Sequence, residues 1–418
     1  MKIRTVALVT ALTTSMLLTS CSDDSSDGGD GRTTIDVWLM RDSVSQEFQQ
    51  EFVDAFHEAH PDIRVNVQIQ EWNGVGQRVT AALASNDAPD VIEVGNTQVA
   101  QYAASGGVTD LTDRVEELNG ADWISGLAEP GAVDGRQYGI PYYAANRVVI
   151  YRTDLFEAAG IDPAELTTRD AWLAATETLN EPEGQQGVYL PGQNWYALAG
   201  FVWDEGGELA VETADGWEGT LDTPEALAGM DFYQRLQSLG QGPRDSDEAQ
   251  PPQVEVFAGE EVAQIIAVPG GANLIVERNP ELEGRIGFFP IPGKTPDTPG
   301  AVFTGGSNLI IPAASGDQDA AYTFIQELTG ETWQRELSRA MSYVPNRTGL
   351  ADAVADEPGT AAMAVGAAEG RATPNTPDWA AVEAENPIKD YMTAVLTGGD
   401  PEAAAREASE VITRALNP

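Results

Sequence analysis

The chain has 418 residues, 42% of them hydrophobic, so it is long enough to build two cores of ordinary domain size. Its 66 acidic and 23 basic residues leave a formal net charge of -43 at pH 7, which repels phosphate backbones and excludes nucleic acid as a partner. The same charge disfavours anionic solutes unless arginines gather locally, whereas neutral solutes meet no such penalty.

The first twenty residues predict an export signal. Lys2 and Arg4 precede an uncharged, mostly apolar run at 6–18, and small polar residues follow. This run is shorter than the roughly 20 residues that span a bilayer as a helix. We therefore expect removal of residues 1–20 rather than a permanent membrane span.

The residues around the expected cleavage point indicate a lipid anchor. Leu18-Thr19-Ser20-Cys21 resembles the bacterial lipobox, in which the cysteine thiol is acylated and becomes the new N-terminus, and Cys21 is the only cysteine in the chain. Residues 21–32 are expected to be a flexible tether, because the stretch after Cys21 is made of polar residues and glycine. The sequence thus predicts an extracytoplasmic protein that touches the membrane only through its lipid.

Strands and helices alternate from residue 33 onward. Thr33–Met40 is rich in β-forming residues, and Ser43 then opens a segment with the apolar spacing of an amphipathic helix: Val44, Phe48, Phe52 and Phe56. Residues 63–69 alternate as a strand does, 79–84 predict a helix and 91–94 a short buried strand. This order predicts a parallel sheet with helices on its faces.

The same alternation restarts at residues 148–151, with a helix near 171–179, and again around 262–268. Two α/β lobes therefore fit the length better than one, and the chain has no repeat of 20 to 50 residues that would indicate a solenoid. Joints rich in glycine and proline at 139–141, 290–306 and Pro345 predict the crossings between the lobes.

Several short motifs follow one another along the chain. They are IDVW at 35–38, APDV at 88–91, DGRQYGIP at 134–141, YRTDLF at 151–156, FAGE at 257–260 and GRATPNTP at 370–377. Their order resembles that of the extracellular solute-binding proteins of ABC importers, the family of maltose-binding and other sugar-binding components. The family often has Gly-x-Trp where this chain reads PGGAN at 269–273, which removes one aromatic platform.

The resemblance implies an α/β, two-lobed fold of the periplasmic-binding-protein type (type II) with a ligand cleft between the lobes. It implies that 33–142 and 304–345 form lobe 1 and that 143–303 and 346–418 form lobe 2. The implied function is that of a substrate-binding lipoprotein, a monomer that captures a sugar or oligosaccharide by closure of its lobes and delivers it to the permease subunits of an ABC importer. Neither enzymatic activity nor a cofactor or metal is expected.

Candidate ligand-binding residues lie in loops that face such a cleft, since open α/β sheets bind ligands beyond the carboxyl ends of their strands. A sugar has hydroxyl groups around its rim and C–H patches on its faces, so it needs polar side chains together with flat aromatic rings. The loops after the early strands carry Arg41, Asp42, Glu71, Trp72, Asn96 and Thr97. The resemblance adds contacts from the crossings and the second lobe at Tyr142, Tyr143, Trp195, Trp203, Gly270, Asn273, Gly306, Tyr343, Arg347 and Trp379.

Other interpretations stay open at this point. The solute can instead be a polyol or a glycerol phosphate ester, with Arg41, Arg347 and Arg371 as candidates to bind the anion. A binding lipoprotein for sensing or adhesion is a further alternative. So is a surface carbohydrate-active enzyme, about which the abundant carboxylates are uninformative.

Three local patterns imitate other sites without meeting their requirements. His57-Glu58-Ala59-His60 spaces its histidines one residue short of the zinc hydrolase motif. Gly293-Lys294-Thr295 has Phe288 where a phosphate-binding loop requires glycine. The acidic run at 245–248 lacks the glycine of a calcium loop and predicts a solvated loop.

Overall fold

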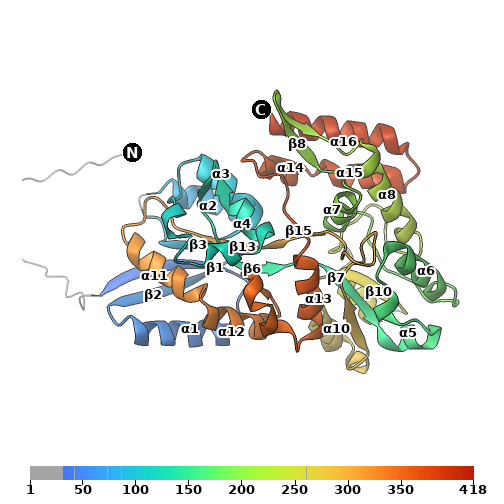
Figure 1. Ribbon diagram of the computed structural model, residues 1–418, viewed down its shortest axis with the longest axis horizontal. Coiled ribbons are helices and arrows are strands. Elements are labelled where there is room, and N and C mark those ends of the chain that lie inside the picture. The colour runs from blue at the N-terminus through green and yellow to red at the C-terminus, as the bar shows by residue number, and fades with distance from the viewer. Residues whose placement is uncertain (1–31, 42, 73, 86, 260) are drawn as a thin grey trace, which may run out of the picture.

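The computed structural model describes residues 32–418 except 42, 73, 86 and 260. The predicted export signal, Cys21, the tether up to residue 31 and Asp42 lie outside the described residues. Two lobes stand side by side, and segments far apart in the chain cross between them at the centre (Figure 1). In the part that the structure describes, no helix is both long and apolar enough to cross a lipid bilayer.

A six-stranded sheet of order β14-β6-β13-β3-β1-β2 forms the centre of the first lobe. Its strands are β1 (Thr33–Met40), β2 (Ile63–Gln70), β3 (Val91–Gly95), β6 (Ile140–Ala145), β13 (Gly305–Ile310) and β14 (Val344–Pro345). β1 pairs in parallel with β2 and β3, as predicted. The other half of the sheet, to which that pattern did not extend, is not parallel: β13 pairs antiparallel with β3 and β6. The reason is that β3 and β6 end at the central crossings, whereas β13 begins there.

Helices cover both faces of this sheet (Figure 1). They are α1 (Gln46–Ala59), α2 (Val75–Leu83), α3 (Val99–Ala104), α4 (Ser125–Ala128), α11 (Gln318–Leu328) and α12 (Glu331–Met341). The helix predicted from the phenylalanine spacing is α1, but Ser45 rather than Ser43 caps it, by accepting from the backbone N–H of Phe48 (3.1 Å). Phe52 packs edge to face against Phe324 of α11, with 5.2 Å between ring centroids, and this contact packs α1 against α11.

The second lobe surrounds a small antiparallel sheet of order β10-β7-β11. Its strands are β7 (Val148–Arg152), β10 (Gln264–Ala267) and β11 (Ile286–Phe289), with a hairpin of β8 (Ala210–Thr213) and β9 (Gly216–Gly219) at the rim. Its helices are α5 (Thr153–Ala159), α6 (Arg169–Leu179), α7 (Trp195–Asp204), α8 (Pro224–Gln237), α9 (Gln253–Gly259), α10 (Gly271–Arg278), α13 (Pro358–Ala367), α14 (Trp379–Glu385), α15 (Pro387–Leu396) and α16 (Pro401–Leu416). Trp172 of α6 is fully buried in this core, where its indole N–H donates to Gln264 Oε1 (2.8 Å).

The crossings between the lobes lie close together. The chain leaves β6 for β7 through Asn146 and Arg147, and it returns through Thr304, between β12 (Val302–Phe303) and β13. β12 pairs in parallel with β15 (Gly370–Arg371) in the middle of the molecule (Figure 1). The sheet of the first lobe continues to Ala145, whereas the sequence placed this crossing after residue 142. The joint expected at 139–141 includes the start of β6, where an irregular register accommodates Pro141.

Trp172→Ala is expected to lower the free energy of unfolding by about 3–5 kcal/mol, because it leaves a cavity in the second core and deprives Gln264 of its donor. Trp72→Ala is the matched control: Trp72 is 41% exposed, so its loss should change the unfolding free energy by less than about 0.5 kcal/mol. Denaturant unfolding followed by circular dichroism measures both. Equal losses in the two variants would contradict the assignment of Trp172 to the core.

Candidate functional site

A cleft of about 880 Å³ lies between the two lobes. Aromatic rings from both sides line it: Trp72, Tyr143, Tyr196, Phe303 and Tyr343. Between the rings are neutral polar side chains: Asn96, Thr97, Gln98, Asn273, Ser307 and Ser342. The cleft therefore offers flat apolar faces together with uncharged hydrogen-bonding groups.

Tyr143 and Tyr343 form a stacked pair on the wall that the first lobe provides. Their ring centroids are 4.0 Å apart and their planes differ by 6°. The Tyr143 hydroxyl donates to Oε1 of the fully buried Glu93 (3.1 Å) and accepts from Ser307 Oγ (3.2 Å). Because β3, β6 and β13 supply these three side chains, neighbouring strands of one sheet hold the aromatic pair in place.

Tyr196, at the start of α7, lies among partners from the crossings. The Arg147 guanidinium is 4.5 Å from the centre of its ring, and the Phe303 ring is 4.6 Å away at an angle of 31°. Burial raises the pKa of Tyr196 to about 12, so its hydroxyl keeps its proton at neutral pH. Arg147 is paired with Glu248, which neutralises its charge beside the cleft.

Glu248 belongs to the acidic run at 245–248, which is a loop as predicted, but its residues 246–248 are only partly exposed to solvent. Asp247 in the same run pairs with Lys389 of α15 (2.9 Å). Arg147 and Lys389 lie far from this loop in the sequence, so local composition did not reveal either ion pair. The loop instead supports the wall of the cleft beneath Tyr196.

Thr97 and Glu383 connect the lobes directly. Thr97 Oγ1 donates to Glu383 Oε2 on α14 (3.3 Å), and the Trp379 indole donates to Glu383 Oε1 (3.1 Å). Asn96 orients this loop, because its amide donates to the Thr304 carbonyl (2.8 Å) and its Oδ1 accepts from the N–H of Thr97 (3.1 Å). Burial raises the pKa of Glu383, since its hydrogen bonds come from neutral donors.

The family model for bacterial extracellular solute-binding proteins matches residues 42–335, more than half of the chain. The chain is a bacterial extracellular solute-binding protein. The diacetylchitobiose-binding protein DasA of Streptomyces coelicolor is 37% identical to it over 97% of each chain. The mannitol-binding protein of Pseudomonas aeruginosa is 26% identical, over 75% of this chain and 70% of its own.

Solved structures confirm the predicted fold class. The sugar-binding protein MalE of Xanthomonas citri aligns with a TM-score of 0.81 over 92% of this chain and 97% of its own, at 23% identity. The GacH receptor of Streptomyces glaucescens aligns with a TM-score of 0.77 over 92% of this chain and 98% of its own, at 21% identity. This solute-binding protein therefore has the two-lobed α/β architecture of that group.

Half of the residues predicted to bind ligand line the cleft of this solute-binding protein. They are Trp72, Asn96, Thr97, Tyr143, Gly270, Asn273, Gly306 and Tyr343. Arg41 and Glu71 pair with each other nearby (2.8 Å), and the Trp72 indole donates to the Arg41 carbonyl (3.2 Å). This pair holds Trp72 at the edge of the cleft.

The other predicted residues lie elsewhere. Tyr142, Trp195 and Trp379 are buried in the two cores, and Arg347 forms a backbone bridge with Trp123. α7 is buried on nearly every side, and Trp195 points into the core. The next residue along the helix, Tyr196, lines the cleft instead. Asp42 is outside the described residues.

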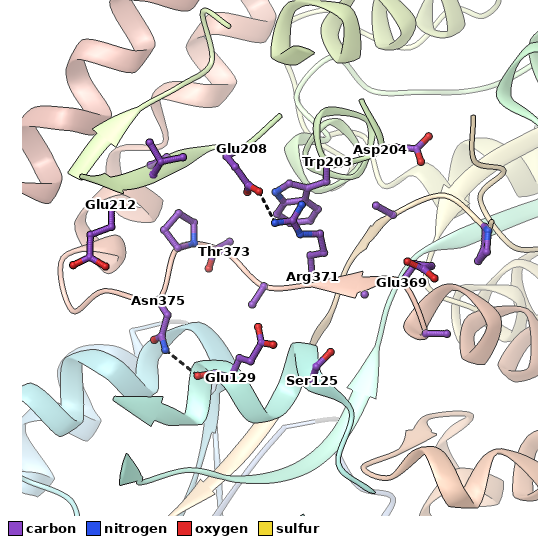
Figure 2. A pocket seen from close by; sticks show the side chains of 18 of the residues that line it. Ser125, Glu129, Trp203, Asp204, Glu208, Glu212, Glu369, Arg371, Thr373 and Asn375 are labelled. Atoms are coloured by element: carbon purple, nitrogen blue, oxygen red, sulfur yellow. Dashed lines mark hydrogen bonds and ion pairs between the residues drawn. The ribbon is translucent and has the colours of Figure 1, made fainter. Parts of the chain in front are cut away.

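Trp203 lines a second pocket, of about 820 Å³, beside β15 (Figure 2). Arg371 covers its ring with 5.5 Å between the guanidinium and the ring centre, and pairs with Glu208 (2.6 Å). On the lobe 1 side, the Asn375 amide donates to the Glu129 carbonyl (2.8 Å). This pocket shares no lining residue with the cleft, so Trp203 and the cleft rings belong to different surfaces.

Sequence reasoning missed Arg147, Tyr196, Phe303 and Ser307 in the cleft. Arg147 had a usable signal, because it is a basic residue between two apolar strands at a crossing. Tyr196 had none, since α7 is apolar on nearly every side and its periodicity does not show which ring faces the ligand.

Glu383→Gln is expected to stabilise the protein at neutral pH. The folded-state pKa of Glu383 is raised, so the folded protein holds this proton more tightly than the unfolded chain, and wild-type stability falls as pH rises through the folded-state pKa. Glutamine carries no charge to desolvate, so its advantage should shrink as pH is lowered toward 4.5. Thermal unfolding from pH 4.5 to 8 measures the difference. If the stability advantage of Glu383→Gln grew at low pH, the pKa of Glu383 would be lowered in the folded protein and not raised.

Proposed function

We propose that this protein captures an acetylated amino-sugar oligosaccharide such as diacetylchitobiose and passes it to the permease of an ABC importer. The observation that carries the proposal is the cleft, in which five aromatic rings alternate with neutral polar side chains. Sugars stack their C–H faces on such rings and exchange hydrogen bonds through their hydroxyls. The 37% identical relative that binds diacetylchitobiose supports this ligand class.

The apolar side chains of the cleft favour an acetylated sugar over an unmodified one. Val268 and Leu274 line the cleft and are 43% and 51% exposed, among the most exposed large apolar residues that the structure describes. Met341 and Met363 add flexible apolar surface. Acetamido methyl groups would cover this surface and remove it from water.

The charges at the cleft disfavour a glycerol phosphate ester as the ligand. Arg147 is the one charged residue among the described lining residues, and Glu248 already neutralises it. Arg41 and Arg371, which the sequence offered as candidates for an anion, pair with Glu71 and Glu208. Arg347, the third candidate, does not line the cleft. A neutral ligand fits these charges, because an anion at Arg147, Arg41 or Arg371 would have to displace a carboxylate.

Closure of the lobes is the proposed signal to the permease. A ligand held by rings of both lobes makes its full set of contacts only when they are together, so binding shifts the population toward the closed form. The Thr97–Glu383 hydrogen bond spans the lobes and would form on closure. A permease that recognises the closed shape would then distinguish loaded from empty protein.

Calorimetry with diacetylchitobiose tests the ligand. We expect saturable binding, and we expect Tyr196→Ala to weaken it by about 2 kcal/mol, roughly thirtyfold, through loss of a stacking face. Trp217→Ala is the matched control, since Trp217 lines the second pocket, and it should leave the affinity within about twofold. No binding of diacetylchitobiose or of any sugar in a wider panel would refute the proposal.

We also propose that Cys21 carries a lipid that holds the protein, as a monomer, on the outer side of the cell membrane. Full-length protein expressed in a bacterium should incorporate labelled fatty acid and sediment with membranes. Cys21→Ser should incorporate none and appear in the soluble extracytoplasmic fraction, because the thiol is the attachment point. Membrane association that survives this substitution would exclude the lipid as the anchor.

A further inference from the structure

Arg147 brings a charge to a cleft whose other described lining residues are uncharged. It lies in the crossing between β6 and β7, and its Nη2 atom donates to Glu248. The side chains of the two residues are 18% and 24% exposed, so most of the ion pair is withdrawn from water. Desolvation offsets much of the attraction in such a pair, so stability alone does not explain a guanidinium at this place.

Part of the Arg147 guanidinium remains accessible at the cleft. In the described structure, the hydrogen bond of this side chain runs from Nη2 to Glu248, and Nε and Nη1 make none. Neither of these nitrogens is one of the buried polar atoms without a partner, so both are in contact with solvent. Arg147 lines the cleft, so a ligand there can meet them. Because a guanidinium has donors and no acceptor, the ligand must present an acceptor at this point.

The guanidinium is held in place from two sides before a ligand arrives. Arg147 Cζ is 4.5 Å from the centre of the Tyr196 ring, a cation–π contact, and Glu248 holds the Nη2 end. The neighbouring Asp247 pairs with Lys389 of α15 (2.9 Å) and anchors the loop that carries Glu248. A hydrogen bond to a donor that is already fixed costs little ordering entropy on binding.

The charges of the pair favour a neutral acceptor in the ligand. Arg147 and Glu248 cancel each other, so a carboxylate or phosphate would be attracted by one and repelled by the other. A hydroxyl oxygen can accept, but its own hydrogen then needs a further acceptor. An amide carbonyl oxygen has no hydrogen to place, and a charged donor gives it a stronger bond than a neutral donor does.

Apolar surface lies beside the same guanidinium. Tyr196 and Phe303 line the cleft, and their ring centroids are 4.6 Å apart. Together with Arg147 over the Tyr196 ring, they offer a hydrogen-bond donor and apolar surface within the span of one small group. An acetamido group has this pattern, because its carbonyl oxygen and its methyl group are attached to the same carbon.

We propose that Arg147 donates to the carbonyl oxygen of one acetamido group of the bound sugar, and that this bond makes the cleft select acetylated sugars over unmodified ones. The inference rests on the proposed function and adds to it the residue that recognises the acetyl group. Glu248 is then a positioning residue, which holds Nη2 and cancels a charge that would otherwise attract anions.

The first test is calorimetry with diacetylchitobiose and two analogues, each with one acetamido group changed to thioacetamido. Sulfur is a weak acceptor, so one analogue should bind the wild type about tenfold more weakly than the parent sugar. In Arg147→Lys the single nitrogen is held by Glu248, so the ion pair stays and no second nitrogen meets the ligand. This variant should bind the parent sugar about tenfold more weakly than the wild type, and that analogue should lose less than about twofold further.

The other analogue is the internal control, and its penalty should be the same in both proteins. A penalty caused by the larger size of sulfur would persist in Arg147→Lys, and such persistence would overturn the inference. Equal binding of both analogues and the parent sugar by the wild type would overturn it as well. If the wild type binds neither diacetylchitobiose nor any sugar of the wider panel, the proposed function itself fails, which is a different result from binding without a thioacetamido penalty.

Glu248→Gln provides a second and independent variant. It keeps an oxygen for Arg147 and removes the compensating charge. The probe is diacetylchitobiose with an oxalyl group, which adds a carboxylate beside the carbonyl, at the position where sulfur weakens wild-type binding. Glu248→Gln should bind this probe about tenfold more tightly than the wild type does. Asp247→Asn is the matched control: it removes the same charge from the same loop but leaves the Arg147 pair intact, so it should change this affinity by less than about twofold. Equal effects of the two variants would overturn the inference.

Discussion

The site depends on backbone segments that pass between the lobes and must satisfy their polar groups there. Thr304 shows how: its N–H donates to the Arg371 carbonyl (2.9 Å) and its own carbonyl accepts from the Asn96 amide (2.8 Å). Each such group needs a partner, because a buried unpaired backbone group is costly. The crossings are therefore fixed in position, and the side chains beside them, such as Arg147 and Phe303, form the base of the cleft.

Gly306 shows how closely the backbones approach at this base. Its φ is +136°, and an added Cβ would lie 2.1 Å from the Tyr143 carbonyl oxygen, so no other residue fits. The close pairing of β13 with β6 brings Ser307 within hydrogen-bonding distance of the Tyr143 hydroxyl. The aromatic pair of Tyr143 and Tyr343 is thus oriented from below by the sheet.

Two buried carboxyl groups support the walls of the cleft, and the described structure gives both of them hydrogen bonds from neutral donors. Glu93 accepts from Tyr143 below the first wall, and Glu383 accepts from Thr97 and Trp379 across the lobes. A hydrogen bond from a neutral donor holds each carboxyl group in place and adds no charge that would compete for the hydroxyl groups of a sugar. Although the whole chain is strongly acidic, the surface offered to the ligand is therefore nearly neutral.

The sequence by itself determined the local elements and the family, because both can be recognised from residues that lie close together in the chain. The phenylalanine spacing predicted α1, the alternation at 63–69 predicted β2, and the order of motifs predicted the two-lobed fold. Tertiary structure decided the rest: the antiparallel course of β13, the burial of Trp195 beside the accessible Tyr196, and the pairing of Arg147 with Glu248 from 101 residues away. These depend on which distant segments meet at the crossings, and neither periodicity nor composition carries that information.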